Sequence, residues 1–283
     1  MEEKRKYLTK KGDKEVYQYV ENTARYGQEN CHEEFLRIAS IDDPEERKKE
    51  IFKFIKSLED NADQNGFFRH DEKISANFGI GDYAFKLNSR SLYTTFFDEY
   101  RKRRENKPDE PEIISHHIAI LDTLTSYFGD FRGDTDLREQ LLTPKNADEE
   151  RINNNIEDIP SISVLKGKHC AMCAEHASIA HNLLIMGGYE SSYITASHVD
   201  FGNGPEAHAF CIETQVPGKT YLLFDPAQEI FVSLKSKEHP RDMILGEKPL
   251  QIENKGQKII YANSNKVNTK KAEVNTTEVE KAM

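Results

Sequence analysis

A predicted helix that begins at a cysteine, followed by three predicted strands, constrains the fold of this chain more than any other feature. Residues 174–186 are good helix formers, and Gly187-Gly188 directly after them is a typical helix stop signal. Three later segments, 189–195, 207–214 and 220–224, are rich in aromatic and β-branched residues and are separated by Gly, Pro and Asn. We therefore predict an α+β fold in which this helix packs on an antiparallel sheet.

Cys173 lies in the first turn of the predicted helix. A thiol attacks carbonyl groups as its thiolate, and an ordinary Cys thiol, with a pKa of about 8.5, is mostly protonated at neutral pH. A helix N-terminus and a neighbouring imidazole both favour the thiolate. His208, early in the second predicted strand, supplies an imidazole, and Asp225, at the end of the third, supplies a carboxylate to orient it. A hairpin with its turn at residues 216–219 and with His208 opposite Asp225 brings the two side chains together.

The order Cys, His, Asp resembles the transglutaminase-like superfamily, the papain-type fold of microbial peptidases, transglutaminases and peptide N-glycanases. The residues that carry the resemblance are Cys173 with Ala177 four positions later, Gly188-Tyr189 at the helix end, His208-Ala209-Phe210, and Asp225-Pro226. Phe210 stands where family members commonly have Trp, and this chain contains no Trp. The resemblance covers residues 160–235 and implies a papain-like core with a catalytic triad of Cys173, His208 and Asp225.

These residues predict acyl transfer through a thioester. The Cys173 thiolate attacks a carboxamide or peptide carbonyl, His208 protonates the departing amine, and Asp225 orients the imidazole. The backbone N–H of Cys173 is the candidate oxyanion donor. We favour hydrolysis by a protease, amidase or deamidase, because nothing in the sequence marks an amine pocket; transfer to an amine, as in a transglutaminase, is the alternative. We expect a protein or peptide substrate and no cofactor.

The segment 169–176 offers other chemistries. His169, Cys170, Cys173 and His176 are four zinc-type ligands, although their spacing suits one tetrahedral site poorly once the residues from 173 onward are helical. Cys170 and Cys173 also form a Cys-x-x-Cys pair, so a redox module, or control of Cys173 by Cys170, is a second alternative. A non-catalytic binding protein that kept the fold is a third. Four cysteines in 283 residues do not make a disulfide scaffold, and we expect reduced thiols.

We predict three regions: a mostly helical region 1–150, a transglutaminase-like catalytic core 151–262, and a disordered polar tail 263–283. The tail is predicted from its Asn, Lys, Thr and Glu content, with almost no bulky apolar residue after residue 263.

Within the first region, apolar residues recur at helical spacing in residues 13–60, 91–104 and 111–128. Residues 66–87 are less regular and predict a packed loop or short strands. Residues 129–160 are polar and contain turn signals, which predicts a connection into the catalytic half.

The charge balance restricts the partners of the chain. A net charge of −10 argues against general nucleic-acid binding. No apolar run is long enough to span a bilayer, and the first seven residues carry charge in place of an apolar stretch. We therefore expect a cytoplasmic protein without a membrane partner; the oligomeric state is left open.

Overall fold

The structure is a computed structural model that describes residues 5–11, 14–20, 29–60, 74–77, 82–130, 135–142, 159–245, 248–254 and 256–263. Helices and antiparallel strands are both major parts of it, which confirms the prediction of a mixed helix-and-sheet protein. The chain divides into two compact units, a helical unit of Gln28–Gly188 and a sheet unit of Met1–Gly27 with Tyr189–Met283.

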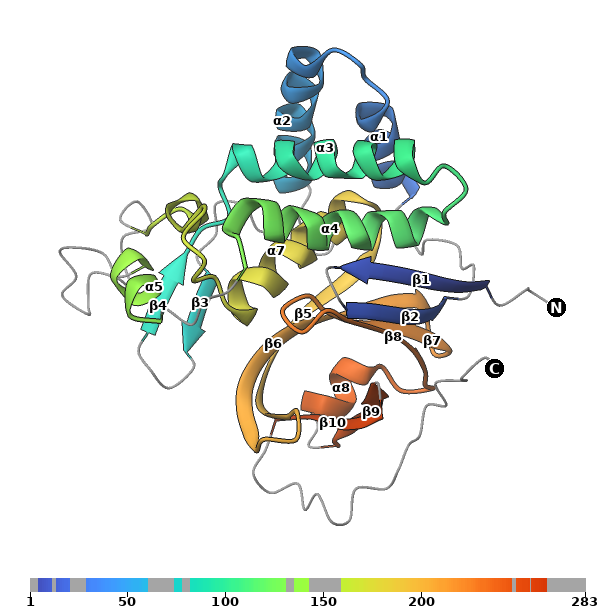
Figure 1. Cartoon of the computed structure of the whole chain (residues 1–283), viewed down its shortest axis with the longest axis vertical. Helices are drawn as coiled ribbons and strands as arrows, with labels where there is room; N and C mark the ends of the chain where they lie inside the picture. Colours follow the sequence, from blue (N-terminus) through green and yellow to red (C-terminus); the bar gives the residue numbers. More distant parts are fainter. Residues whose placement is uncertain are drawn as a thin grey trace. The chain divides into compact units, whose positions relative to one another are not determined.

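The helical unit contains most of the helices (Figure 1). Its elements are α1 (Glu29–Ala39), α2 (Pro44–Asp60), β3 (Ile74–Asn77), β4 (Asp82–Phe85), α3 (Arg90–Asn106), α4 (Glu112–Phe128), α5 (Thr135–Leu142), a 3-10 turn (Ile162–Leu165) and α7 (Cys173–Met186). Helices α3 and α4 pack side by side, and both α4 and α1 contact α7.

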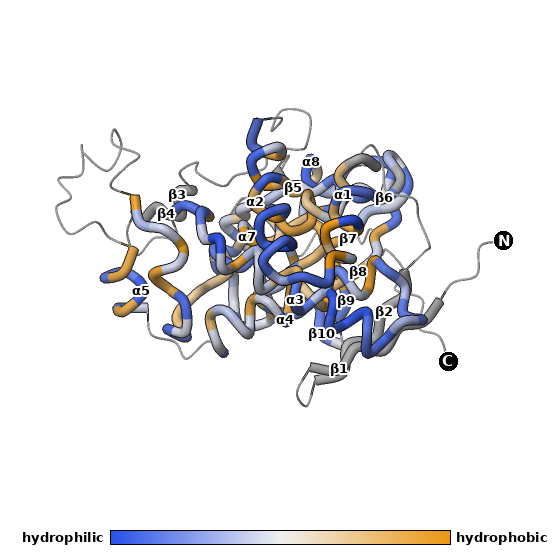
Figure 2. Tube along the Cα trace, turned by 90° about the horizontal axis from the view of Figure 1, so that it is seen from above, coloured by the Kyte–Doolittle hydropathy of each residue, from blue (hydrophilic) through white to orange (hydrophobic). Residues whose placement is uncertain are grey.

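The predicted helix periodicity is reflected in how α2 is buried. Ile51, Phe54, Ile55 and Leu58 face the core, and the hydrophilic residues between them produce the alternation along α2 in Figure 2. Asp43 caps this helix, since its carboxylate accepts hydrogen bonds from the backbone N–H groups of Glu45 and Glu46.

A buried histidine joins α4 to α7. The His116 ring packs edge-on against Phe35 and Phe96, and its Nε2 lies 2.9 Å from the carbonyl oxygen of Leu183. The turn after α7 fits closely around it, because a Cβ at Gly187 would clash with Cε1 of the His116 ring. The glycine stop signal is thus also a packing requirement.

The sheet unit is built on a six-stranded antiparallel sheet with the order β8-β7-β6-β5-β10-β9. Its elements are β5 (Glu190–Asp200), β6 (Pro205–Val216), β7 (Thr220–Asp225), β8 (Ile230–Lys235), α8 (Pro240–Leu245), β9 (Leu250–Asn254) and β10 (Gln257–Ala262). The three predicted strands correspond to β5, β6 and β7. One hydrophobic core, which includes Phe210, Leu223 and Tyr261, runs across these strands and takes in Ile244 of α8.

Two predictions for the first half of the chain were wrong. Residues 14–20, predicted as helix, form strand β2 (Lys14–Val20), which pairs antiparallel with β1 (Arg5–Lys11). The segment is dominated by Val and Tyr, whose preference for strands prevails over their helix-like spacing. Residues 135–142, predicted as part of a polar connection, form α5.

The other predictions for the chain ends and connections have mixed outcomes. Residues 74–77 and 82–85 are short strands, as predicted for part of 66–87. Outside the described residues lie 66–73 and 78–81 of that segment, much of 129–160, and the predicted tail after residue 263. The predicted region boundaries at residues 150 and 262 stay predictions. The two compact units show which residues contact one another, and they do not show which segments fold independently. Within the described ranges, no helix is both long and apolar enough to cross a membrane.

Candidate functional site

Cys173 is the first residue of α7, where the sequence places it. Met172 before it is extended, and the first helical hydrogen bond runs from His176 N–H to the carbonyl oxygen of Met172. The backbone N–H of Cys173 is therefore one of the N-terminal donors that have no acceptor within the helix. Cys173 is partly buried, whereas the other three cysteines are buried.

A buried ion pair fixes the turn that carries Cys173. Glu175 accepts a hydrogen bond from Met172 N–H at 2.8 Å through Oε2, and its Oε1 accepts from Arg138 Nε at 3.0 Å. Arg138 of α5 and Glu175 are both almost completely buried. Sequence reasoning missed this pair. A Glu three residues after the cap position is a capping-box signal, whereas no spacing rule leads from Glu175 to Arg138.

The two histidines beside the Cys-x-x-Cys pair pack against the C-terminal end of α4. His169 has a φ of 58°, and its backbone N–H donates to the carbonyl oxygen of Phe128. Its ring Nδ1 lies 3.0 Å from the carbonyl oxygen of Asp130. The His176 ring stacks on the Phe128 ring at 5.7 Å. All four cysteines are outside disulfides. Among the described residues there is no group of three or more side chains placed to hold a metal ion.

His208 and Asp225 meet in the interior of the sheet unit. Their Nε2 and Oδ2 atoms are 2.8 Å apart, His208 is 3% exposed and Asp225 is fully buried. The adjacency was predicted correctly, but the register was wrong by two residues. The ladder pairs Cys211 with Phe224 and shifts beside the turn, between Thr214 and Val216. A slip of two residues keeps each side chain on its original face, and diagonal neighbours remain within reach of long side chains.

Tyr261, on β10, completes the surroundings of Asp225. Its hydroxyl donates to Asp225 Oδ2 at 3.1 Å, and the backbone N–H of Gln228 donates to Oδ1 at 3.3 Å. Burial, reinforced by the Asp225 charge, raises the pKa of Tyr261 well above its ordinary value. The hydroxyl therefore keeps its proton and remains a donor. No sequence pattern indicates that Tyr261 contacts Asp225. The two residues are 36 positions apart, and Tyr261 lies on β10, which pairs with β5 on the side away from β6.

Aromatic rings hold the imidazole in its plane. Phe210 is nearly parallel to the His208 ring at 6.4 Å, and Phe201 meets that ring edge-on at 5.0 Å. Phe210 also contacts Tyr261 at 4.6 Å, so one aromatic side chain supports both partners of Asp225. These contacts limit rotation of the imidazole and keep Nε2 directed at the carboxylate.

The geometry of the pair defines what His208 can do. A buried carboxylate on Nε2 fixes the orientation and tautomer of the ring and stabilises its protonated form, and Nδ1 is then the nitrogen for proton transfer. The structure brings His208 and Asp225 together in the sheet unit, whereas Cys173 belongs to the helical unit.

Comparisons with protein-family models, with curated proteins and with solved structures found no match to this chain.

Proposed function

We propose that the chain is a cysteine-dependent acyl-transfer enzyme of the transglutaminase-like type, with a papain-type core, that hydrolyses a peptide or amide bond. Cys173 is the nucleophile, His208 the general base and acid, and Asp225 the residue that orients His208. The observation that carries the proposal is the buried hydrogen bond between His208 Nε2 and Asp225 Oδ2. A second observation supports the role of the nucleophile: Cys173 lies at the start of a helix, a position that favours the thiolate over the thiol.

The first half of the proposed reaction forms an acyl-enzyme. It requires the two units to bring the Cys173 sulfur within hydrogen-bond distance of His208 Nδ1. His208 takes the thiol proton, and the sulfur forms a bond to the carbonyl carbon of the substrate. The backbone N–H of Cys173 donates to the resulting oxyanion. The carbon–nitrogen bond then breaks, His208 returns the proton to the leaving nitrogen, and an amine or ammonia departs.

The second half consumes one water molecule. His208 removes a proton from the water, and the oxygen forms a bond to the thioester carbon. The carbon–sulfur bond then breaks to release a carboxylic acid, and His208 returns the proton to the Cys173 sulfur. Asp225 stabilises the charged imidazole in both halves, and Tyr261 and Gln228 hold Asp225. This scheme uses side chains and backbone groups of the chain and water. If an amine takes the place of water, the same intermediate gives a transglutaminase product.

A peptide mixture tests the proposal against many sequences at once, so that no single substrate has to be chosen. The full chain is incubated with the mixture in water enriched in heavy oxygen, with and without an added primary amine, and the products are identified by mass spectrometry. We expect heavy oxygen in new carboxyl groups, as the result of peptide cleavage or glutamine deamidation. Incorporation of the amine would identify the transglutaminase reaction.

Two variants decide whether Cys173 is responsible. Cys173→Ala is expected to abolish the products. Cys170→Ala changes the neighbouring thiol, which is fully buried, and is expected to leave them in place. Products that survive Cys173→Ala would contradict the proposal. Products lost equally in both variants would favour a shared redox or zinc role of the two cysteines.

A further inference from the structure

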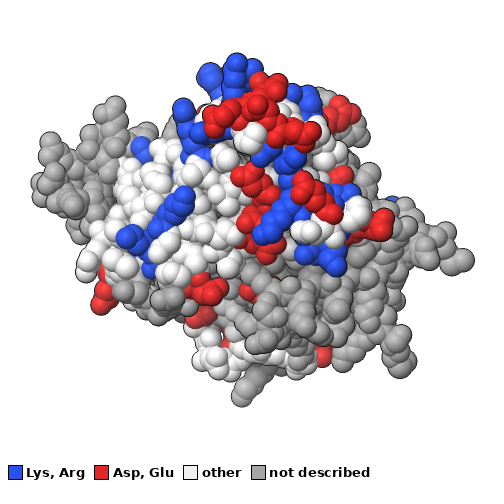
Figure 3. Space-filling view, turned by 45° about the horizontal axis from the view of Figure 1, so that its top comes forward, with Lys and Arg blue, Asp and Glu red and all other residues white. Residues whose placement is uncertain are grey.

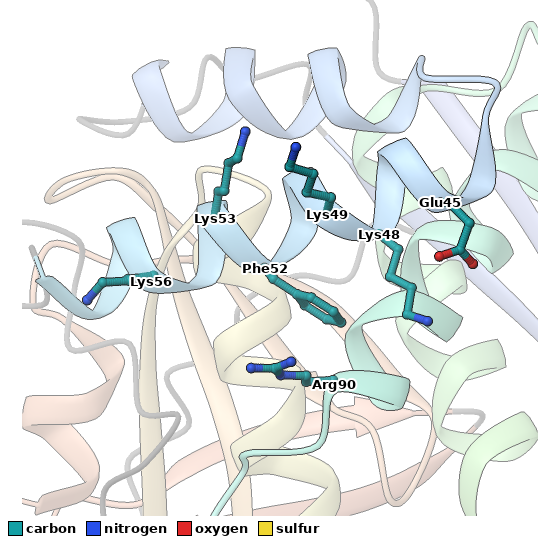
Figure 4. A pocket seen from close by; sticks show the side chains of 7 residues that line it. All are labelled: Glu45, Lys48, Lys49, Phe52, Lys53, Lys56 and Arg90. Carbon is teal, nitrogen blue, oxygen red and sulfur yellow. The ribbon is translucent and has the colours of Figure 1, made fainter.

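A pocket on the helical unit is lined by five cations and one anion. It lies between α2 and the first residue of α3, has a volume of about 410 Å³, and is formed by Glu45, Lys48, Lys49, Phe52, Lys53, Lys56 and Arg90 (Figure 4). We call it the basic pocket. The whole chain has a net charge of −10, so the basic pocket is a local region of positive charge on an acidic protein.

The spacing of α2 explains how the pocket forms. The pocket residues of α2 recur at intervals of three and four, so they follow one another along the helix surface. The core-facing residues Ile51, Phe54, Ile55 and Leu58 occupy the other side of α2. The helix is thus anchored by its buried side, and its lysines remain in solvent.

Three of the five cations have no carboxylate partner among the described residues. Lys53 pairs with Glu50 at 2.5 Å and Lys56 with Asp60 at 3.2 Å, both within α2 and both exposed. Lys48, Lys49 and Arg90 form no ion pair with any described side chain. Their charges are therefore available to an anionic group from outside.

A cation–π contact with Phe52 favours one orientation of the exposed Arg90 side chain. Its guanidinium carbon lies 4.7 Å from the centre of the Phe52 ring, and Figure 4 shows the two side chains next to each other, with Lys48 nearby. A guanidinium that is already ordered loses less entropy when it binds, and its planar fork fits a carboxylate with two parallel hydrogen bonds. Phe52 is partly buried, which keeps the stacking surface in position.

We propose that the basic pocket binds an acidic segment of a partner protein, with side-chain carboxylates on Arg90, Lys48 and Lys49. From Lys48 to Lys56 the helix advances about 12 Å, the length of three to four residues of extended chain. A single small anion would contact only part of this row of basic residues, whereas successive carboxylates on a peptide match the length of the whole row, which includes the paired Lys53 and Lys56.

The surroundings of the pocket favour a short acidic segment over a nucleic acid. Glu45 lines one end, and Glu50 and Asp60 lie on the same helix. On the face seen in the space-filling view of Figure 3, the described residues carry acidic side chains interspersed with basic ones. A long polyanion would meet these carboxylates on either side of the pocket, and it would be repelled by the net charge of the chain.

Fluorescence anisotropy tests the binding. The probe is a fluorescein-labelled peptide with four consecutive glutamates between glycines, titrated with the full chain at low and at physiological salt. We expect saturable binding that weakens as salt rises, because exposed charge pairs are screened. Charge reversal in Lys48→Glu/Lys49→Glu/Arg90→Glu is expected to weaken binding by roughly tenfold or more, because three attractive charges become repulsive.

Two controls separate the pocket from net charge. Lys107→Glu/Lys219→Glu/Lys237→Glu reverses three exposed lysines outside the pocket, as many charges as the pocket variant reverses. It is expected to change the affinity less than about threefold, because these charges lie away from the site and are screened. Phe52→Leu keeps every charge but removes the stacking surface, and a loss of roughly two- to fivefold is expected. Absence of binding, equal losses in the pocket variant and the Lys107/Lys219/Lys237 variant, or tighter binding of a single-stranded RNA of matched charge would each overturn the proposal.

Discussion

Replacement of Tyr261 by Phe removes one hydrogen bond from the Asp225 carboxylate and leaves the aromatic packing in place. Asp225 is fully buried and accepts hydrogen bonds from His208, Tyr261 and the backbone N–H of Gln228. In the variant, Oδ2 keeps only the bond from His208. The carboxylate cannot replace the lost donor with bulk water, because no part of it is exposed.

The size of the effect follows from the charge of the acceptor. A hydrogen bond to a charged group contributes about 1.5–3 kcal/mol, and the loss here falls on a buried carboxylate. We expect Tyr261→Phe to lower the free energy of unfolding by about that amount at pH 8, where the Tyr261 hydroxyl is protonated in the folded and the unfolded chain.

The pH dependence is the more discriminating part of this prediction. The pKa of Tyr261 is raised in the folded chain, chiefly by burial and then by Asp225. Above about pH 10 the unfolded chain loses this proton while the folded chain keeps it, so the stability contributed by Tyr261 falls by about 1.4 kcal/mol per pH unit. The stability difference between wild type and Tyr261→Phe should therefore be fully present below about pH 10 and should close as pH rises above it.

Urea unfolding of both proteins between pH 8 and pH 11 measures the difference. The remaining tyrosines titrate in both proteins and cancel in the comparison. A stability difference that stays constant through this range would refute the buried Tyr261–Asp225 hydrogen bond as the cause. So would equal stability of the two proteins at pH 8.

Two further predictions concern the helical unit. Glu175→Gln leaves the Arg138 charge buried without its counter-charge and should lower the free energy of unfolding in urea by about 3–5 kcal/mol, whereas Arg138→Met/Glu175→Leu, which removes both charges, should cost much less; equal losses would contradict a buried ion pair. Gly129→Ala places Ala at φ 78° and ψ 174°, a backbone conformation that is essentially restricted to glycine, and its Cβ would also clash with the His169 ring. Gly167→Ala at φ 65° has no atom within 4 Å of its Cβ and should cost about 1–2 kcal/mol, so Gly129→Ala should cost at least about 1–3 kcal/mol more in thermal unfolding; the two glycines behaving alike would contradict both the strained conformation of Gly129 and the close packing of His169.

Local sequence signals predicted the elements that carry the candidate residues. The helix-forming run before Gly187-Gly188 predicted α7 with Cys173 at its start, and the aromatic and β-branched segments predicted β5 to β7. Each signal spans fewer than about 15 residues and depends on propensities of neighbouring residues. Local propensities predict a helix or strand correctly where the tertiary contacts of the segment favour the same structure.

Features that depend on distant contacts were missed or misplaced. Tyr261 reaches Asp225 only through the β5–β10 pairing. Arg138 of α5 reaches Glu175 only through tertiary packing, in which α5 contacts β4 and the 3-10 turn Ile162–Leu165. The β6–β7 register was wrong by two residues, because propensity predicts which segments are strands and not how two strands are aligned. The Val- and Tyr-rich segment 14–20 has both helical spacing and strand propensity, and its pairing with β1 decides between them.

Alkylation of Cys173 probes the proposed triad itself and needs no substrate. A thiol with the ordinary pKa of about 8.5 is less than about 1% ionised at pH 6. Iodoacetamide labelling at a series of pH values, located by mass spectrometry, is compared between wild type and His208→Ala. Cys170, Cys211 and Cys31 serve as internal references, since all three are buried and burial raises the pKa of Cys31.

We predict fast, selective labelling of Cys173 near pH 6 that collapses in His208→Ala. Slow labelling of all four cysteines with the same pH dependence, or fast labelling of Cys173 that His208→Ala leaves unchanged, would contradict the proposed Cys173–His208–Asp225 enzyme.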